Sequence, residues 1–377
     1  MRVLLVNYEY PPLGGGGGIL THSLATDLRS RAEVAVLSSG ARDLPVDLTE
    51  SGVRVIRVPV IGRTERQRAS PLSLAAFVPS AMTVGRRRLG SFVPDVVHTF
   101  FAIPSGPAGA AHARRYGVPH VLTVIGADIH DPSRRFSPDR FAPLRAIVRR
   151  VVRSADAVVA ISTDIAERTR SLTGRADIEV VPCGVDPRPR PEPSRASLGW
   201  SDDDFVVVTT ARLVRRKGID HLIAAMAKLP DKARLEIVGH GPERARLEEL
   251  ARRSGRRITF AGDIDDAARD LRLVSADVFC QPSLHEGFGI AIVEAMGFSL
   301  PVIATDSGGP RDFIRHEVNG FLVTPGDDAE LAARLGELAS SSELRARMGA
   351  AAMKRANELT AEAMTETYMK KYESVRG

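Results

Sequence analysis

The chain of 377 residues carries 52 Lys and Arg against 46 Asp and Glu, a formal net charge of +6, and is 44% hydrophobic, 26% charged and 5% aromatic. This is an ordinary globular composition, and the length is too great for one ordinary core, so we expect two domains. Few aromatic residues, and no basic run interleaved with them, argue against nucleic-acid binding.

Short β-branched runs alternate with helix-length spacers over most of the chain. Their hydrophobicity is continuous rather than alternating, which predicts parallel strands buried on both faces and two doubly wound α/β domains. The expected strands are Arg2–Val6, Glu33–Leu37, Val53–Val58, Asp95–His98, His120–Val124, Ala157–Ile161, Ile178–Val181, Phe205–Thr210, Arg234–Val238, Ile258–Phe260, Asp277–Cys280, Pro301–Ala304 and Phe321–Val323.

A glycine run follows the first expected strand. Tyr10-Pro11-Pro12-Leu13 leads into five glycines, Gly14 to Gly18, and a helical segment begins at His22. Such a loop can wrap closely around phosphate. It lacks the acidic residue on a second strand that a dinucleotide-binding fingerprint requires, and a flexible turn is the alternative interpretation.

A second polar loop, Thr123 to Asp131, follows the expected strand at His120–Val124. Asp128, His130 and Asp131 could meet an acceptor hydroxyl as hydrogen-bond partners or as a base. Capping of a helix N-terminus by Asp128 or Asp131 is the alternative.

The segment from Phe136 to Arg153 is Arg-rich, with apolar residues near helical spacing. Together with Arg86-Arg87-Arg88 it could form a basic surface that touches lipid head groups. The alternative is a helix that covers the sheet and solvates its arginines. The positive net charge could favour phosphorylated substrates or an anionic membrane surface, and a composition biased towards Arg and Ala is the alternative explanation.

A proline-rich stretch, Val185 to Pro193, has four prolines in alternation and reads as a stiff linker. We expect an N-terminal domain at residues 1–187 and a C-terminal domain at 188–356, with ligands bound in a cleft between them. The pattern from Glu343 to Tyr372 is helical and too long for one capping helix. Its last part, about residues 357–377, is predicted to return to the first domain.

Two strand-to-helix loops of the second half carry cations and glycines. Arg212 and Lys217 follow the strand Phe205–Thr210 and suit a diphosphate. The arginine supplies a planar guanidinium with paired donors, and the lysine supplies a compact positive charge. Gly239 ends the next strand and permits a flat ring to lie against the backbone. Arg215 and Arg216 are interpreted as solvated. Asp306-Ser307-Gly308-Gly309-Pro310 is either a pocket wall or a plain turn.

The most informative stretch runs from His285 to Met296. Glu286 and Glu294 lie eight positions apart, the first in a Gly-rich loop and the second about two turns into the following helix. Free backbone N–H groups of Gly287 to Gly289 would seat an anion. Carboxylates beside an anion site suggest sugar hydroxyls, from a hexose at Glu286 and a ribose at Glu294.

Cys183 and Cys280 have no metal-ligand spacing and favour a reduced, cytoplasmic setting. The apolar run at the start of the chain is too short for a signal-peptide core, and no stretch approaches the ~18–20 apolar residues of a spanning helix. Any membrane contact is expected to be peripheral, at the inner face. Because no His/Cys/Asp/Glu cluster has metal spacing, we expect no metal and no cofactor, with Arg212 and Lys217 neutralising the leaving phosphate.

With these residues in hand, the chain resembles a GT-B glycosyltransferase of family 4, a large group of retaining transferases. The likeness covers nearly the whole chain. Its motifs are Pro-x-x-Gly-Gly at Pro11, the Gly-Val-Asp hinge at Gly184, Arg-x4-Lys-Gly at Arg212, Glu-x7-Glu at Glu286, and the returning C-terminal helix. The combination of Arg-x4-Lys with Glu-x7-Glu, which contains Gly-Phe-Gly, is specific to this family.

The resemblance implies transfer of a hexose from a UDP- or GDP-sugar with retained anomeric configuration, in which the leaving phosphate helps to deprotonate the acceptor. It implies a donor diphosphate on Arg212 and Lys217, the donor sugar on Glu286 and the ribose on Glu294. The expected donor-binding set is Gly17, Gly18, Arg212, Lys217, Gly239, Glu286, Gly287, Phe288, Gly289, Ile290 and Glu294. The catalytic candidates are Asp128, His130, Arg212, Lys217 and Glu286.

The chain departs from the family pattern at two places. The histidine of Thr-x-His-Gly-x-Asp is Ile125 here, so Asp128 or His130 becomes the substitute, and an unusual acceptor is indicated. The hinge reads Pro182-Cys183-Gly184-Val185-Asp186, which affects only local turn hydrogen bonds. A glycan, a lipid-linked glycan or a small molecule fits as acceptor. The alternative functions are a sugar-nucleotide epimerase and a non-catalytic sugar-nucleotide-binding subunit of a glycan assembly complex.

Overall fold

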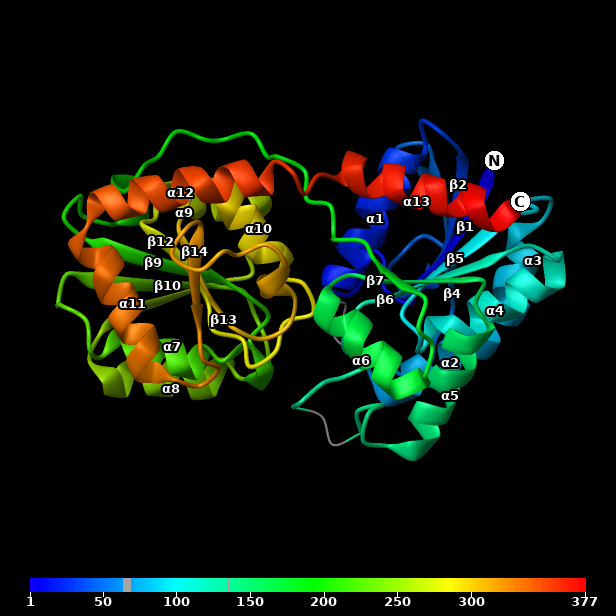
Figure 1. Cartoon of the computed structure of the whole chain (residues 1–377), viewed down its shortest axis with the longest axis horizontal. Coiled ribbons are helices and arrows are strands. Elements are labelled where there is room, and N and C mark those ends of the chain that lie inside the picture. The colour runs from blue at the N-terminus through cyan, green and yellow to red at the C-terminus, as the bar shows by residue number, and fades with distance from the viewer. Residues whose placement is uncertain (64–68, 134–135) are drawn as a thin grey trace. The chain divides into compact units, whose positions relative to one another are not determined.

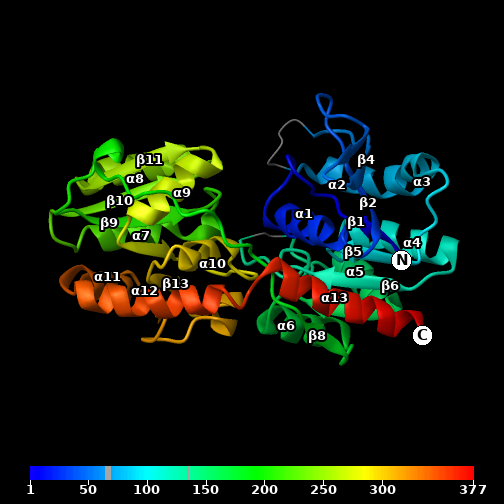
Figure 2. The ribbon, with the colours of Figure 1, turned by 90° about the horizontal axis from the view of Figure 1, so that it is seen from above.

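The computed structural model describes residues 1–63, 69–133 and 136–377. They fold into two compact units, one of Met1–Gly184 with Thr360–Gly377 and the other of Val185–Leu359. Each unit is a sheet covered by helices (Figure 1 and Figure 2). No helix within the described ranges is long enough and apolar enough to cross a membrane.

The first unit contains an eight-stranded sheet in the order β3-β4-β2-β1-β5-β6-β7-β8. All its pairs are parallel except β3 with β4. The parallel strands are rich in buried Val, Leu and Ile, as expected where helices cover both faces. The strands are β1 Arg2–Val6, β2 Glu33–Ser39, β3 Asp47–Glu50, β4 Val53–Val58, β5 Val96–Phe100, β6 His120–Val124, β7 Ala157–Ala160 and β8 Ile178–Val180.

The helices of the first unit connect these strands. The chain runs outward from β1 in one direction and from β5 in the other, so the loops after β1 and β5 meet at the switch point of the sheet. The helices are α1 Gly16–Leu28, α2 Pro71–Ser80, η1 Ala81–Gly85, α3 Arg86–Leu89, α4 Ser105–Tyr116, α5 Ala142–Ser154, α6 Thr163–Thr173 and, from the end of the chain, α13 Ala361–Arg376.

Helix α13 packs on the first unit, which confirms the predicted return of the C-terminal segment. It contacts α1 and buries Tyr368 and Tyr372 almost completely. His98 Nδ1 lies 2.7 Å from the Tyr372 hydroxyl, and Thr123 Oγ1 lies 2.8 Å from the Tyr368 hydroxyl. Burial lowers the pKa of His98 to about 3, with His120 acting in the same sense, so this imidazole is neutral at pH 7. Two buried hydroxyls therefore fix the helix to β5 and β6.

The second unit contains a six-stranded, fully parallel sheet in the order β11-β10-β9-β12-β13-β14. The strands are β9 Phe205–Thr210, β10 Ala233–Val238, β11 Arg257–Gly262, β12 Val278–Gln281, β13 Val302–Thr305 and β14 Gly320–Val323. The helices are η2 Ala196–Leu198, η3 Arg215–Lys217, α7 Ile219–Met226, α8 Arg244–Ser254, α9 Asp266–Ser275, α10 Ile290–Gly297, η4 Gly309–Asp312, α11 Asp328–Ser340 and α12 Ser342–Ala356.

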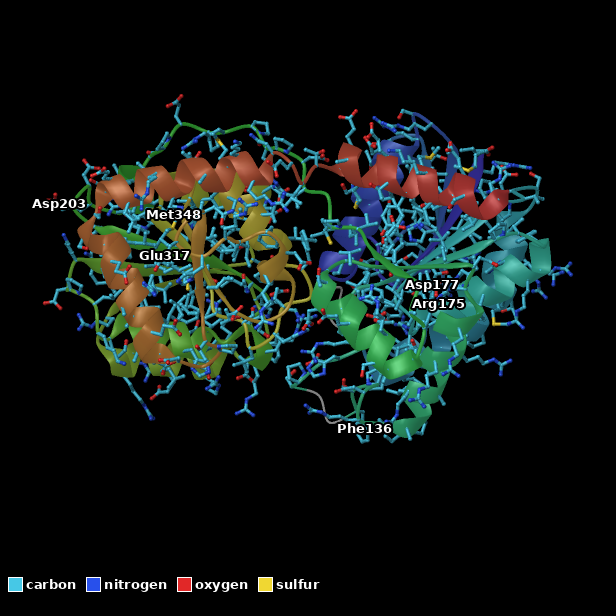
Figure 3. All side chains as sticks on the ribbon, in the orientation of Figure 1. Phe136, Arg175, Asp177, Asp203, Glu317 and Met348 are labelled. Carbon is cyan, nitrogen blue, oxygen red and sulfur yellow. The ribbon has the colours of Figure 1, made fainter. Side chains whose placement is uncertain are left out.

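The core of the second unit lies between this sheet and its helices. Met348 of α12 is fully buried in it, whereas Asp203 and Glu317 are exposed at the surface of the unit (Figure 3). The apolar faces of the helices cover the faces of the sheet. The carboxyl ends of the strands are therefore surrounded by connecting loops.

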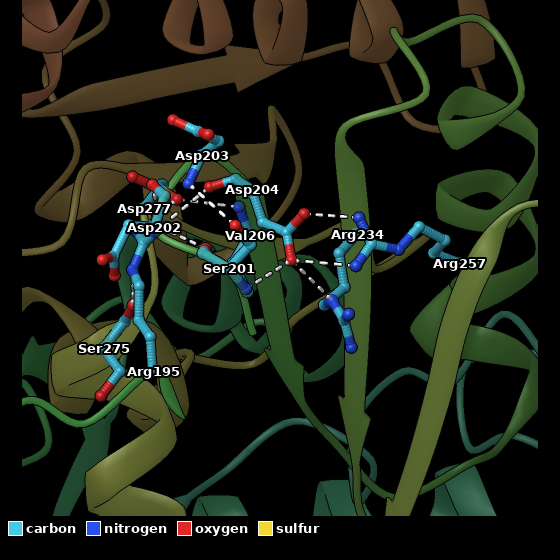
Figure 4. A network of polar contacts seen from close by, with 10 residues as sticks. All are labelled: Arg195, Ser201, Asp202, Asp203, Asp204, Val206, Arg234, Arg257, Ser275 and Asp277. Carbon is cyan, nitrogen blue, oxygen red and sulfur yellow. Dashed lines mark hydrogen bonds and ion pairs between the residues drawn. The ribbon is translucent and has the colours of Figure 1, made fainter. Parts of the chain in front are cut away.

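A network of ion pairs lies at the other end of the second sheet, where the strands begin (Figure 4). The buried Asp204 carboxylate accepts from Arg257, at 3.0 Å for the Nη2–Oδ2 pair, and lies 3.3 Å from Arg234 Nε. Asp277 accepts from Arg195 Nη2 at 2.7 Å and from the amide of Val206 at 2.8 Å. These pairs connect the segment before β9 to β10, to β11 and to Asp277, the residue that precedes β12.

The predicted fold class is confirmed, and all thirteen predicted strands are present, with ends shifted by at most two residues. The additional strand, β3, is polar and exposed at the sheet edge, so it lacks the apolar run that the prediction relied on. The predicted helix from Phe136 to Arg153 is wrong at its start. Helix α5 begins at Ala142 because Pro143 fits the first turn of a helix but not its interior.

Candidate functional site

The carboxyl ends of β9 and β12 form the switch point of the second sheet, because the chain runs outward from β9 to β10 and from β12 to β13. The loops after these strands are in backbone contact. The amide of Leu284 donates to Arg216 O at 2.8 Å, and a Cβ on Gly218 would lie 2.0 Å from Pro282 O. Gly218 also has φ +62, so glycine is required on both counts.

Lys217 and Glu286 form an ion pair across these two loops. Lys217 Nζ lies 2.5 Å from Glu286 Oε2, and the two side chains are 14% and 11% exposed. Ser283 Oγ donates to the same carboxylate oxygen at 3.1 Å and accepts from Gln281 Nε2 at 3.0 Å. Two predicted site residues, 69 positions apart, are thus brought together.

The charge around this pair is unbalanced. Burial alone would raise the pKa of Glu286, but Lys217 and Arg216 hold it below its ordinary value. Burial lowers the pKa of Lys217, and Arg216 and Arg212 act in the same sense against Glu286. Lys217 and Arg216 thus both act on the Glu286 carboxylate, and a bound anion would compensate the remaining positive charge of these two residues. The interpretation of Arg216 as a solvated residue is wrong, since it is half-buried and acts on both members of the pair.

The loop from Gly287 to Ile290 presents its backbone to the same region. Gly289 has φ +108 and is the N-cap residue that precedes α10, and the Phe288 ring is buried against Phe313 at a centroid distance of 5.1 Å. Within the described ranges, no acceptor takes the amide N–H groups of residues 287–290. Gly309 packs behind this loop, since a Cβ there would lie 2.4 Å from Phe288 Cα. Unsatisfied amides beside three cations suit an anion.

Glu294 lies on α10, which begins at Ile290, so it stands about one turn into the helix and not two as expected from the sequence. Arg188 Nη2 donates to Glu294 Oε1 at 3.1 Å. Burial raises the pKa of Glu294 to about 7, although Arg188 opposes the rise. The same side of the unit thus holds a second carboxylate that is partly charged at neutral pH.

Gly239 has a structural reason to be glycine. It has φ +127, and a Cβ there would lie 2.0 Å from Ala211 O, so the loops after β9 and β10 touch through their backbones. A Cβ on Gly241 would likewise lie 2.3 Å from Leu213 O. Asp306 pairs with Arg311 at 2.6 Å on the surface, whereas Gly308 and Gly309 of the same segment lie against the backbone of Glu286 and Phe288, which favours the pocket-wall interpretation.

In the first unit, Gly17 and Gly18 lie in the first turns of α1 and are buried. A Cβ on Gly17 would lie 2.4 Å from the Phe101 ring and 3.3 Å from Ile125 Cδ1, so the loops after β1, β5 and β6 meet there. Ile125, which stands where the family has histidine, is thus close to the glycine run. Whether Gly17 and Gly18 also approach a diphosphate stays a prediction.

Asp128 holds the loop after β6 in place. Its Oδ1 accepts from the amides of Ile125 and Gly126 at 3.1 and 2.8 Å, and its Oδ2 accepts from the amide of Ala102 at 2.7 Å. Burial raises the pKa of this carboxyl, against the three backbone hydrogen bonds. Both oxygens are engaged in backbone bonds, which favours a positioning role for Asp128 over proton transfer.

His130 has a partner that sequence reasoning missed. Its Nδ1 lies 2.9 Å from Asp139 Oδ2, and Ser137 Oγ donates to the other oxygen of Asp139. Burial would raise the pKa of Asp139, but Ser137 and His130 lower it, so the carboxylate is charged beside the ring. Asp131 Oδ1 accepts from the amide of Ser133 at 3.0 Å and stabilises a turn. Asp139 lies nine positions from His130, a spacing that carries no motif.

Two family models match the chain: the glycosyl transferase 4-like domain over residues 15–184, and glycosyl transferases group 1 over residues 191–355. The uncharacterized glycosyltransferase MJ1607 of Methanocaldococcus jannaschii is 31% identical over 346 residues, covering 86% of this chain and 85% of that protein. The GDP-mannose-dependent alpha-mannosyltransferase of Mycolicibacterium smegmatis is 31% identical over 390 residues, covering 100% of this chain and 98% of the relative.

The chain is also similar to a solved structure, that of Anabaena Alr3699/HepE in complex with UDP and glucose. The identity is 25%, the TM-score is 0.80, and the match covers 99% of this chain and 100% of the other. Sequence, fold and the pairing of Lys217 with Glu286 agree with the resemblance found in the motifs. The chain belongs to the group 1 glycosyl transferases, family 4 of the GT-B fold, and is a glycosyltransferase that uses nucleotide-sugar donors.

Proposed function

We propose that the protein transfers a hexose, with retained anomeric configuration, from a nucleoside-diphosphate sugar to a hydroxyl of a glycan, a lipid-linked glycan or a small molecule. The acceptor oxygen bonds to the anomeric carbon while the bond from that carbon to the leaving diphosphate breaks. The proton of the acceptor passes to the leaving phosphate on the same face of the sugar. Arg212 and Lys217 neutralise the charge that develops on the diphosphate, the role that a cation takes in other transferases.

The observation that carries this proposal is the Lys217–Glu286 pair at the switch point. A diphosphate would be attracted by the positive side chains of Lys217, Arg216 and Arg212, and the amides of residues 287–290 would donate to its oxygens. Glu286, held ionised by Lys217, would accept hydrogen bonds from hexose hydroxyls. Glu294 would accept from the ribose.

UDP is favoured as the donor base, because the HepE structure holds UDP and glucose. GDP is the alternative, because the mannosyltransferase relative is named GDP-mannose-dependent. A thermal-shift screen of the wild-type protein with UDP-glucose, GDP-mannose and an ADP-sugar separates these donors. A true donor at 100 times its Kd stabilises the fold by about 2.7 kcal/mol. No stabilisation by any of the three would remove the proposed donor site.

The first unit is proposed to bind the acceptor. The pair of His130 with Asp139 is the better candidate there for proton handling, since Asp128 uses both oxygens to fix its own loop. The Asp139 carboxylate, 2.9 Å from Nδ1, fixes the orientation of the imidazole ring. His130 would therefore orient an acceptor hydroxyl in the place of the histidine that Ile125 replaces.

Peripheral contact with an anionic membrane is a further part of this proposal. Phe136 lies at the surface beside the start of α5 and is 61% exposed (Figure 3), and Ile147 on α5 is 42% exposed. The same helix carries Arg145, Arg149, Arg150 and Arg153, although Arg149 and Arg153 donate to backbone carbonyls of residues 172 and 173. Exposed apolar side chains beside arginines suit a lipid head-group layer.

Pelleting with vesicles tests the membrane contact. We expect binding to vesicles of phosphatidylglycerol mixed with phosphatidylcholine, weakened by raising the salt, and little binding to phosphatidylcholine alone. Ile147→Glu should reduce the bound fraction, because it places a negative charge among the arginines. Equal pelleting with and without anionic lipid would count against the contact.

A further inference from the structure

Arg188 lies four residues past Gly184, at the start of the extended segment that leads into the second unit. Its guanidinium faces three carboxylates. Nη2 donates to Glu294 Oε1 at 3.1 Å, and Nη1 lies 3.1 Å from Asp266 Oδ2 and 3.5 Å from Asp270 Oδ2. The proline-rich segment is thereby connected to α9 and α10 through one side chain.

Helix α9 supplies the other charged groups that face Glu294. Arg269 pairs with Asp266 and with Asp270, each at 3.1 Å, and its Nη2 is 4.0 Å from Glu294 Oε1. The cluster thus has three carboxylates and two guanidiniums. Arg188 makes the direct hydrogen bond to Glu294, while Arg269 is engaged mainly by its own helix.

Among the described residues, the ion pairs of Glu294 are with Arg188 and Arg269, and none is with a residue of α10 or α12. Helix α10 carries no other ionisable side chain. Helix α12 packs on α10, but its Arg345 pairs with Asp277 and its Arg355 with Glu358. The charge on the Glu294 carboxyl therefore depends on the linker and on α9.

The two oxygens of Glu294 differ in their surroundings. Oε1 accepts from Arg188, whereas Oε2 accepts no hydrogen bond from any residue in the described part of the chain. The side chain is 9% exposed, so a ligand reaching it would meet a nearly immobile carboxylate. One oxygen is thus anchored and the other is left to accept.

We propose that Arg188 is a positioning residue for the donor: it orients the Glu294 carboxylate and keeps it ionised, so that Oε2 can accept both ribose hydroxyls of the nucleotide. This inference rests on the proposed function. It adds a residue outside the family motifs, carried on the segment that joins the two units.

The titration of Glu294 gives this role its direction. Burial raises its pKa to about 7, Arg188 lowers it, and Asp270 and Asp266 raise it further. Removing Arg188 leaves burial and both aspartates unopposed, so the pKa rises and the carboxyl is protonated at neutral pH. Removing Asp270 has the opposite effect. A protonated carboxyl has lost acceptor capacity, so donor affinity should follow the ionised fraction.

Calorimetric titration with UDP, and with GDP in parallel, tests this between pH 6 and pH 9. If Arg188→Ala raises the pKa of Glu294 by about 1, this variant should bind the nucleotide about fivefold more weakly than wild type at pH 7 and almost equally well at pH 9. Arg188→Lys should restore part of the affinity, and kcat at saturating donor should change little. Arg190→Ala is the matched control, because Arg190 is exposed on the same segment and donates to Ser299 and not to Glu294.

Two further variants separate the possible failures. Asp270→Asn should move the loss of binding to lower pH, and Glu294→Gln should abolish the pH dependence. If the wild type binds the nucleotide and Arg188→Ala binds it with the same pH dependence, the inference is overturned and the proposed function is left intact. Failure of the wild type to bind either nucleotide would overturn both. If Arg188→Ala does not fold, Arg188→Lys and Asp270→Asn decide.

Discussion

Lys217 Nζ lies 2.5 Å from Glu286 Oε2, so one ion pair connects the loops that follow the two strands at the switch point of the second sheet. The two members have different tasks. Lys217 lies beside Arg216 and Arg212 in a group of cations that suits a diphosphate, and Glu286 is the carboxylate that Lys217 and Arg216 hold ionised. Removing one or the other should therefore change different steps.

We expect Lys217→Met to weaken UDP binding by roughly 10–100-fold, since a hydrogen bond to a charged group contributes about 1.5–3 kcal/mol. Glu286→Gln should leave UDP binding unchanged or tighter, because the site becomes more positive, while sugar transfer falls by at least a similar factor. Calorimetry with UDP and a transfer assay with the identified donor measure the two effects. Arg215→Ala, an exposed neighbour, is the control. Equal loss of UDP binding in both site variants would contradict this division.

The glycines of the site loops make a second prediction. Gly218→Ala places a Cβ 2.0 Å from Pro282 O in a left-handed backbone, so the loops after β9 and β12 must separate. We expect loss of donor binding and a lower Tm. Gly336→Ala is the matched control, because no atom lies within 4 Å of its Cβ in α11. That change should stabilise the protein by up to about 1 kcal/mol. Unchanged donor affinity in Gly218→Ala would argue against the contact.

The strands could be predicted because buried parallel strands have a distinctive composition. Val3 to Val6 are fully buried and uniformly apolar, and Val206 to Val208 repeat this in the second unit. β3 escaped prediction because Asp47–Glu50 is mostly exposed and pairs only with β4. The start of α5 was misplaced because arginines and apolar residues kept a helical spacing on both sides of Pro143.

The site could be predicted only where a motif kept its members close in sequence. Arg212, Lys217 and Glu286 were found from spacing. Arg188 was missed because it lies in a proline-rich linker and meets Glu294 across 106 positions. Asp139 was missed because a lone aspartate beyond a variable loop carries no signal. Tertiary contacts of this kind follow from the fold and have no local pattern.

A third prediction separates the two acidic residues of the first unit. Asp139→Asn should lower kcat for transfer and shift its pH profile, because His130 loses a charged partner at 2.9 Å. Donor affinity should stay unchanged. Asp128→Asn should instead lower Tm, because three backbone amides lose a charged acceptor. Kinetics across pH and thermal unfolding of both variants check this. A normal kcat in Asp139→Asn would remove the His130 pair from the mechanism.

A fourth prediction concerns stability and pH. Burial would raise the pKa of Asp204, but the Arg257 guanidinium and the amide of Ser201 hold it below its ordinary value. A carboxyl whose folded pKa is depressed stabilises the fold at pH values above its unfolded pKa, about 3.9, and that stabilisation is lost as the pH falls through the folded value. The contribution of Asp204 should therefore be constant from pH 7 to pH 5 and shrink below about pH 4.

Urea unfolding of Asp204→Asn measures this contribution. Removing one member of a buried ion pair costs about 3–5 kcal/mol, and we expect about 2–4 kcal/mol here because the Arg257 side chain is 45% exposed to solvent. Asp203→Asn is the matched control, since Asp203 is the residue next to Asp204 (Figure 4) and its side chain is exposed. The control should change stability by less than about 0.5 kcal/mol. A difference between Asp204→Asn and wild type that stays the same at pH 7 and pH 3 would show that shape, and not charge, holds this end of the sheet.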